Sequence, residues 1–161
     1  MVSHPLIISS RHNPVIRPAT GNDLPYLLEL LEQLFSIEED FLFDAKKQVK
    51  GLELLLEQDN SQILVAEIHG RVVGMATGQL LVSTAEGNLT LLVEDVVVNP
   101  AHQGHGTGAA LLQAIGDWGR SFGAHRMQLL ADLENTQALK FYKKEKWQKT
   151  QLICLRKYHE H

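Results

Sequence analysis

The fold is decided by one stretch of the chain, residues 91–112, which reads LLVEDVVVNPAHQGHGTGAALL. Its first half is rich in β-branched residues and predicts a strand that ends in an Asn-Pro turn. Glycine then recurs at every second position, at Gly104, Gly106 and Gly108, before the apolar spacing of a helix begins. Backbone N–H groups are unpaired at such a helix start, and glycines let a bulky anion approach them closely. The stretch therefore predicts a phosphate-binding loop.

Two common phosphate-binding loops do not match this stretch. A P-loop ends in Gly-Lys-Ser or Gly-Lys-Thr, whereas Gly106 is followed here by Thr107 and Gly108. A dinucleotide-binding loop follows its strand directly and needs a second βαβ unit. Here residues 99–102 intervene, and only about fifty residues remain after the loop.

Two motifs together resemble the GCN5-related N-acetyltransferase (GNAT) family. The first is the loop Gln103-x-x-Gly106-x-Gly108, which follows a Glu-Asp-Val-x-Val-x-Pro strand. The second, further along the chain, is Asn135-x-x-Ala138-x-x-Phe141-Tyr142. The resemblance extends over residues 15–155.

The chain departs from the family pattern at two positions. Lys146 stands where glycine commonly ends the second motif, which puts the geometry of that turn in question. Thr107 replaces the usual aliphatic residue of the loop, a change that backbone-mediated binding should tolerate.

Hydrophobic spacing along the chain predicts alternating strands and helices. We expect helices over about residues 24–35, 45–58, 107–122 and 135–146, and strands over 15–20, 62–68, 72–82, 89–98, 125–131 and 147–157. This order, βααβββαβαβ, matches the α/β fold of the GNAT family, with a mixed, mostly antiparallel sheet of six or seven strands flanked by about four helices. Residues 1–14 show no sustained periodicity, so we expect a loose arm before a single domain over 15–161.

Composition and charge limit the possible partners. The chain has 161 residues, 44% hydrophobic and 21% charged, as expected for one globular domain. Its formal net charge of −4 argues against nucleic acid as the main partner and favours a small cation. The apolar run Leu6-Ile7-Ile8 is too short for a membrane span, so we expect no membrane association.

Cysteine and histidine are used sparingly. Cys154 is the single cysteine, which excludes a disulfide within the chain and favours a reducing cytoplasm. Its apolar neighbours predict an inert core thiol. His102 and His105 flank the glycine loop without carboxylate or cysteine companions, so we expect no metal site.

The resemblance implies acetyl-CoA as the co-substrate. The diphosphate is assigned to the start of the helix that follows the loop, because a helix N-terminus attracts anions. The contributing residues are Gln103, Gly104, His105, Gly106, Thr107 and Gly108. The backbone of Val96, Val97 and Val98 is expected to hold the pantetheine arm as a pseudo-strand. Asn135 is expected to cap a helix, and by resemblance also contacts the pantetheine.

The resemblance also suggests catalytic groups. Tyr142 is the expected acid for the thiolate, and a backbone N–H near Val96 the expected oxyanion donor; a packing role is the alternative for Tyr142. Glu94 is the preferred base. It would share a strand face with Val96, whereas Asp95 would point to the opposite side, and a Glu-Asp pair resembles the polyamine acetyltransferase branch. Use of water instead of a base is the alternative.

The acceptor is expected to be an amine. Glu38, Glu39 and Asp40 form an acidic cluster between the first two helices that would attract a cation, although a solvated charge run needs no function. The predicted reaction is direct transfer of acetyl from acetyl-CoA to a small cationic primary amine in a ternary complex. Alternatives are a peptide or protein acetyltransferase, acting on an N-terminus or a lysine, and a non-catalytic acyl-CoA sensor. By resemblance we also expect a homodimer.

Overall fold

The computed structural model describes residues 13–38 and 40–160, so most of the arm expected at residues 1–14 lies outside the described part. The elements are, in order, β1 (Val15–Pro18), the 3-10 turn η1 (Gly21–Asp23), α1 (Leu24–Phe35), α2 (Ala45–Glu57), β2 (Ser61–Ile68), β3 (Arg71–Ser83), β4 (Asn88–Val98), the 3-10 turn η2 (Pro100–His102), α3 (Thr107–Ser121), β5 (Met127–Leu129) and α4 (Thr136–Lys144). The expected α/β fold is confirmed. Within the described residues no helix has the length and apolar character needed to cross a membrane.

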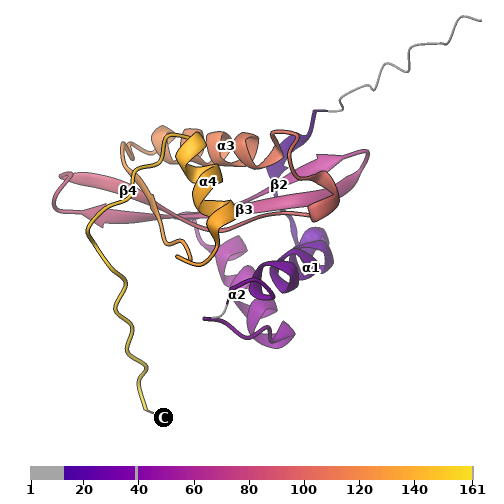
Figure 1. Cartoon of the computed structure of the whole chain (residues 1–161), viewed down its shortest axis with the longest axis horizontal. Helices are drawn as coiled ribbons and strands as arrows, with labels where there is room; N and C mark the ends of the chain where they lie inside the picture. Colours follow the sequence, from indigo (N-terminus) through magenta and orange to yellow (C-terminus); the bar gives the residue numbers. More distant parts are fainter. Residues whose placement is uncertain (1–12, 39, 161) are drawn as a thin grey trace, which may run out of the picture.

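The five strands form one sheet in the order β1-β2-β3-β4-β5. The first four pair antiparallel with their neighbours, and β4 pairs parallel with β5. Figure 1 shows α3 and α4 over one face of the sheet and α1 and α2 over the other. Each face has its own apolar core, because side chains alternate along the strands: Ile63 and Val65 of β2 pack with α1 and α2, whereas Leu64 and Ala66 pack with α3.

The helices begin and end where their sequence signals indicate. Thr20 and Asp23 form a capping box ahead of α1. The Asp44 side chain accepts hydrogen bonds from the first amides of α2, and Asn135 accepts one from Ala138 in α4. Gly123 follows α3 with a φ of 92°, a conformation that favours glycine.

β4 contains a bulge that reverses its side-chain alternation. Thr77 of β3 pairs with Glu94, but Met75, two residues away, pairs with Val97. The extra residue lies at Asp95, which has a positive φ of 50°. Before the bulge Val93 packs against α3, whereas after it Val97 packs against α1 and α2. One inserted residue thus exchanges the faces of β4.

The expectation of six or seven strands is wrong, because the strand expected over 147–157 is absent from the described chain. Residues 148–160 adopt no helix or strand, and residues 151–160 are all exposed. Cys154 is exposed with them, so the expected core thiol is also wrong. Apolar composition favours a strand here, but a strand forms only against a neighbouring strand, and this segment extends away from the body (Figure 1).

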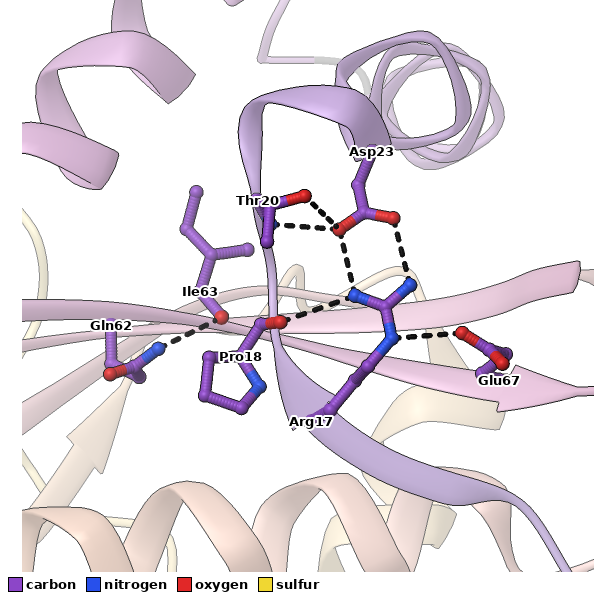
Figure 2. A network of polar contacts seen from close by, with 7 residues as sticks. All are labelled: Arg17, Pro18, Thr20, Asp23, Gln62, Ile63 and Glu67. Carbon is purple, nitrogen blue, oxygen red and sulfur yellow. Dashed lines mark hydrogen bonds and ion pairs between the residues drawn. The ribbon is translucent and has the colours of Figure 1, made fainter. Parts of the chain in front are cut away.

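A polar network joins the sheet to the helical layer (Figure 2). The guanidinium of Arg17 on β1 donates two hydrogen bonds of 2.9 Å to Asp23 and one of 2.8 Å to Glu67 on β2. Asp23 also accepts from the backbone N–H of Thr20 at 2.8 Å. These bonds hold the pKa of Asp23 below its usual value, chiefly because Arg17 binds the ionised form.

Candidate active site

β4 extends beyond its pairing with β5. The two strands pair at Leu91–Val93 with Met127–Leu129, where β5 ends, and β4 continues to Val98. The β5-facing edge of Val96, Val97 and Val98 therefore has no neighbouring strand among the described residues. An amide-bearing chain can bind such an edge as a strand does.

The open edge leads to the N-terminus of α3. Gly104 and Gly106 have φ values of 78° and 85°, and a Cβ added to either would meet nothing within 4 Å. Gly106 is the N-cap, and no side chain of the described residues caps the helix, so the first-turn amides of α3 have no side-chain acceptor there. The buried hydroxyl of Thr107 also has no hydrogen-bond partner among the described residues. The loop thus brings several unpaired N–H and O–H hydrogen-bond donors of the described residues next to open space.

Gln103 connects this loop to its neighbours through its side chain. The amide nitrogen donates to the carbonyl of Val98 at 2.9 Å, and the amide oxygen accepts from Gln137 of α4 at 3.4 Å. The side chain therefore links β4, the loop and α4. His105 lies beside it, exposed to solvent.

α4 packs closely on the start of α3, and Tyr142 is the neighbour of the residue at that contact. A Cβ on Gly108 would lie 3.1 Å from the Phe141 ring, so glycine at this position lets the two helices approach. Tyr142 is half-buried, with its ring 5.3 Å from Phe141 and 5.8 Å from Trp147. Lys146 adopts the left-handed φ of 66° that ends the helix, and Trp147 donates back to the carbonyl of Tyr142 at 2.9 Å. The turn that glycine commonly makes at this position in the family therefore forms here with lysine.

A cavity of about 350 Å³ lies between the helices α1 and α2 and the strands β3 and β4. Glu94 and Asp95 both line it, together with Lys47 and apolar residues of the two helices. The expectation that only one of the two carboxylates faces the cleft is wrong, because the bulge at Asp95 interrupts strict alternation. Glu94 also does not share a face with Val96, which packs against the α3 core.

Burial, followed by neighbouring negative charge, raises the pKa of three groups around the site. Burial, and then the nearby charge of Glu94, raise the pKa of Asp95 to about 6, although a 3.2 Å hydrogen bond from the Thr77 hydroxyl opposes the shift. Burial and the charges of Asp95, Asp132, Asp40 and Glu94 raise the pKa of Glu38. Burial, and then Glu38, raise the pKa of Tyr142 to about 12. Glu38, the β4 carboxylates and Tyr142 thus share one electrostatic environment.

The rest of the expected acidic cluster lies apart. Asp40 is exposed and pairs with Arg156 at 3.8 Å, and Glu39 lies outside the described residues. In the described part of the chain, no three His, Cys, Asp or Glu side chains are placed to hold a metal ion.

Three features of the site have no sequence signal. No glycine marks the bulge at Asp95, and nothing indicates the hydrogen bond from Thr77 or the contact of Gln137 with Gln103. Each depends on pairing between segments distant in the sequence.

A sequence model of the Acetyltransferase (GNAT) family matches residues 26–146, which include most of α1, the bulge, the glycine loop and all of α4. The chain belongs to the GNAT family. This confirms the resemblance drawn from Gln103–Gly108 and Asn135–Tyr142.

Two archaeal proteins and one solved structure illustrate the relationship of this GNAT chain to others. An uncharacterised N-acetyltransferase of Methanocaldococcus jannaschii is 25% identical over 140 residues, 86% of this chain and 62% of the relative, so this chain spans about three fifths of that protein. An uncharacterised N-acetyltransferase of Archaeoglobus fulgidus is 27% identical over 129 residues, 79% of this chain and 88% of the relative. The fold is similar to that of aminoglycoside N-acetyltransferase AAC(6')-Iy in complex with CoA, with a TM-score of 0.79, 20% identity and coverage of 90% and 94% of the two chains.

Proposed function

We propose that this chain transfers an acetyl group from acetyl-CoA to a primary amine of a small cationic molecule, by direct attack in a ternary complex. One observation carries the proposal. The bulged segment of β4 has an unpaired backbone edge leading to the free amides of α3 on one side, and a cavity with two carboxylates on the other. A thioester and an amine can therefore approach the same strand from opposite directions.

The residues at the glycine loop fit the diphosphate of CoA. Gly104 and Gly106 leave open space over the first-turn amides of α3, and the helix N-terminus adds about half a positive charge. The edge at Val96–Val98 suits the two amides of the pantetheine, and we propose Asn135 and Gln103 as further contacts for it. Bound acetyl-CoA supplies an activated acyl group with a thiolate as leaving group.

Each step of transfer has a candidate group in this chain. As the amine nitrogen bonds to the acyl carbon, a backbone N–H at the bulge near Val96 stabilises the negative charge on the acyl oxygen. The carbon–sulfur bond then breaks, and the phenol of Tyr142 donates its proton to the departing sulfur. The raised pKa of Tyr142, about 12, keeps this phenol protonated throughout the neutral range.

The amine must lose a proton, and the carboxylates of the cavity are the candidates to accept it. Glu94 is the base that we propose first, because it is exposed to the cavity. Asp95 is the second candidate, since its pKa of about 6 lies nearer to that of an amine than the pKa of an ordinary carboxyl does. Comparing Glu94→Gln with Asp95→Asn in the pH dependence of kcat/KM separates the two.

Negative charge at the cavity favours a cationic acceptor. Glu94 and Asp95 line it with Lys47 as the single cation among its lining residues, and Glu38 is near enough for both carboxylates to raise its pKa. AAC(6')-Iy, the fold relative described above, is an aminoglycoside N-acetyltransferase, and aminoglycosides are small molecules with several amines. We propose polyamines and aminoglycosides as the first acceptors to test. A protein or peptide amine, and CoA binding without turnover, are the alternatives.

The test measures release of free CoA from acetyl-CoA in the presence of polyamines, aminoglycosides and peptides. We expect turnover with a small polycation and a decrease in kcat of about 10²-fold or more for Tyr142→Phe. The matched control is Tyr26→Phe, which removes the hydroxyl of an exposed tyrosine on α1. Activity on peptides alone would contradict the small acceptor, and CoA binding without turnover would contradict an enzyme. A Tyr142→Phe variant as fast as the native protein would contradict the role of Tyr142 as the acid.

A further inference from the structure

A primary amine of this chain lies at the cavity that we propose for the acceptor. Lys47 belongs to the first turn of α2 and lines the cavity of about 350 Å³, and Glu94 and Asp95 line the same cavity from β4. Lys46 and Lys50 are near Lys47 on α2 but do not line the cavity. The chain thus carries one amine of its own on the side from which the acceptor would approach β4.

The ammonium group of Lys47 is not held by a carboxylate. None of the ion pairs between described residues includes Lys47. The residue is exposed, and a lysine side chain is a flexible stem of four carbons that ends in a compact charge. The amine can therefore move within the cavity toward the bulge of β4.

The position of Lys47 in its helix disfavours a positive charge. α2 begins after the Asp44 cap with Ala45, Lys46 and Lys47, and its first turn contains no acidic residue. The N-terminus of a helix carries about half a positive charge, so cations are unfavourable there. A reaction that converts this ammonium to a neutral amide would remove the repulsion.

We propose that the active site of this chain acetylates its own Lys47 when no acceptor occupies the cavity. The inference rests on the proposed function, because it uses the same thioester and the same catalytic groups. Lys47 Nζ gives one proton to Glu94 or Asp95 and bonds to the acyl carbon of acetyl-CoA. The carbon–sulfur bond breaks, and Tyr142 donates its proton to the sulfur. The second proton leaving the nitrogen restores the phenol, so the products are free CoA and an acetylated Lys47.

The tether makes this amine a competitor of a free acceptor. A group that is held beside the reacting carbon reacts as if it were highly concentrated, because no second molecule has to be brought from solution. An acceptor bound in the cavity would exclude Lys47 from the thioester. Acetylation would also remove the single cation of the cavity lining and leave Glu94 and Asp95 without an opposing charge. The modified protein should therefore bind a polycation more tightly.

Mass spectrometry after incubation with acetyl-CoA alone tests the modification. We expect acetylation of Lys47 at a rate per chain that does not depend on protein concentration and is at least about tenfold faster than at Lys46, the control in the same helical turn. Tyr142→Phe and an excess of polyamine should each slow the reaction. Equal acetylation of the two lysines, or a rate per chain that rises with protein concentration, overturns the proposal.

CoA release measured on the same protein separates this proposal from the proposed function. Protein that acetylates free amines but leaves Lys47 unmodified overturns the self-acetylation and leaves the proposed function intact. Protein that binds acetyl-CoA but transfers acetyl neither to free amines nor to Lys47 overturns both.

Two substitutions test the effect of the charge. Lys47→Gln has the neutral amide of the modified residue, whereas Lys47→Arg keeps the positive charge without the amine. We expect the KM for a polyamine to be about threefold lower in Lys47→Gln than in Lys47→Arg. Lys46→Gln and Lys46→Arg are the control pair and should have the same KM. Equal KM values in the two Lys47 variants would contradict the tighter binding of a polycation after acetylation.

Discussion

Asp95 lies at the bulge of β4 and has a carboxyl with a raised pKa. The bulge brings it into the cavity beside Glu94, and burial in that place disfavours its charge. An acid with a pKa of about 6 is half-protonated near pH 6, where an unfolded aspartate is almost fully ionised. The same shift that suits this carboxylate to proton transfer therefore costs stability.

We predict that Asp95→Asn stabilises the protein in a pH-dependent manner. Because the folded-state pKa of Asp95 is raised, the neutral carboxyl is favoured in the folded protein. The stability that goes with the neutral form is fully present below the unfolded pKa and is lost as pH rises through about 6, where the buried carboxyl ionises. Asparagine carries no charge and can still accept the hydrogen bond from Thr77. The variant should gain about 2 kcal/mol in free energy of unfolding at pH 8, relative to the native protein, and little at pH 4.

Urea unfolding of both proteins at the two pH values measures this difference. Asp59→Asn, which changes an exposed carboxylate to the same amide, should alter stability by less than about 0.5 kcal/mol at either pH. An equal effect of Asp95→Asn at both pH values would show that desolvation does not control this carboxyl.

At the scale of elements, the close approach of α3 and α4 places Tyr142. Gly108 and Phe141 are in contact at the crossing, and the tyrosine is the next residue along α4. We predict that Gly108→Val moves α4 outward, lowers the free energy of unfolding by about 1–3 kcal/mol and weakens CoA binding. Gly51→Val is the matched control, because a Cβ at Gly51 of α2 meets nothing within 4 Å.

A double-mutant cycle isolates this contact. Phe141→Leu removes the ring that a side chain at position 108 would meet. The free energy of unfolding lost in Gly108→Val should therefore be partly recovered when the two changes are combined. Strictly additive losses in the unfolding free energy would mean that Gly108 and Phe141 do not limit the spacing of the helices.

The sequence predicts the helices of this fold better than the irregularities of its strands. Local signals predicted the helices well: Thr20, Asp44 and Asn135 act as caps, and the glycine loop opens α3. The bulge was not predicted, because it becomes visible only in the pairing of β4 with β3. The turn at Lys146 forms although lysine there must adopt a φ of 66°, which shows that neighbouring hydrogen bonds can impose a backbone conformation that the residue itself disfavours.

For the candidate site, family motifs predicted which segments meet but not how their side chains lie. The Gln103 side chain bonds to the carbonyl of Val98 at the end of β4, and Phe141, the neighbour of Tyr142, contacts Gly108 at the start of α3. A regular strand would place the two β4 carboxylates on opposite faces, whereas the bulge at Asp95 interrupts that alternation. The strand expected over residues 147–157 does not form, because this apolar segment has no neighbouring strand among the described residues.

At the scale of the whole molecule, the Arg17 network joins two strands of the sheet to the start of the helical layer. Arg17 and Glu67 lie on neighbouring strands, while Asp23 begins the helical layer (Figure 2). The Asp23 side chain is only 7% exposed and depends on Arg17 for compensation of its charge. We predict that Arg17→Met, which keeps the apolar stem, lowers the free energy of unfolding by about 2–3 kcal/mol because a buried carboxylate loses its partner.

The matched control is Arg120→Met, which breaks an ion pair with Asp117 whose side chains are 65% and 53% exposed, and should cost less than about 1 kcal/mol. The pH dependence supplies a second criterion. Because Arg17 lowers the pKa of Asp23, the stability from this pair is present at neutral pH and is lost as pH falls below about 4. The difference between native protein and Arg17→Met in urea unfolding should therefore shrink on acidification. A constant difference would assign the loss to packing of the arginine stem against the sheet, and not to the charge of Asp23.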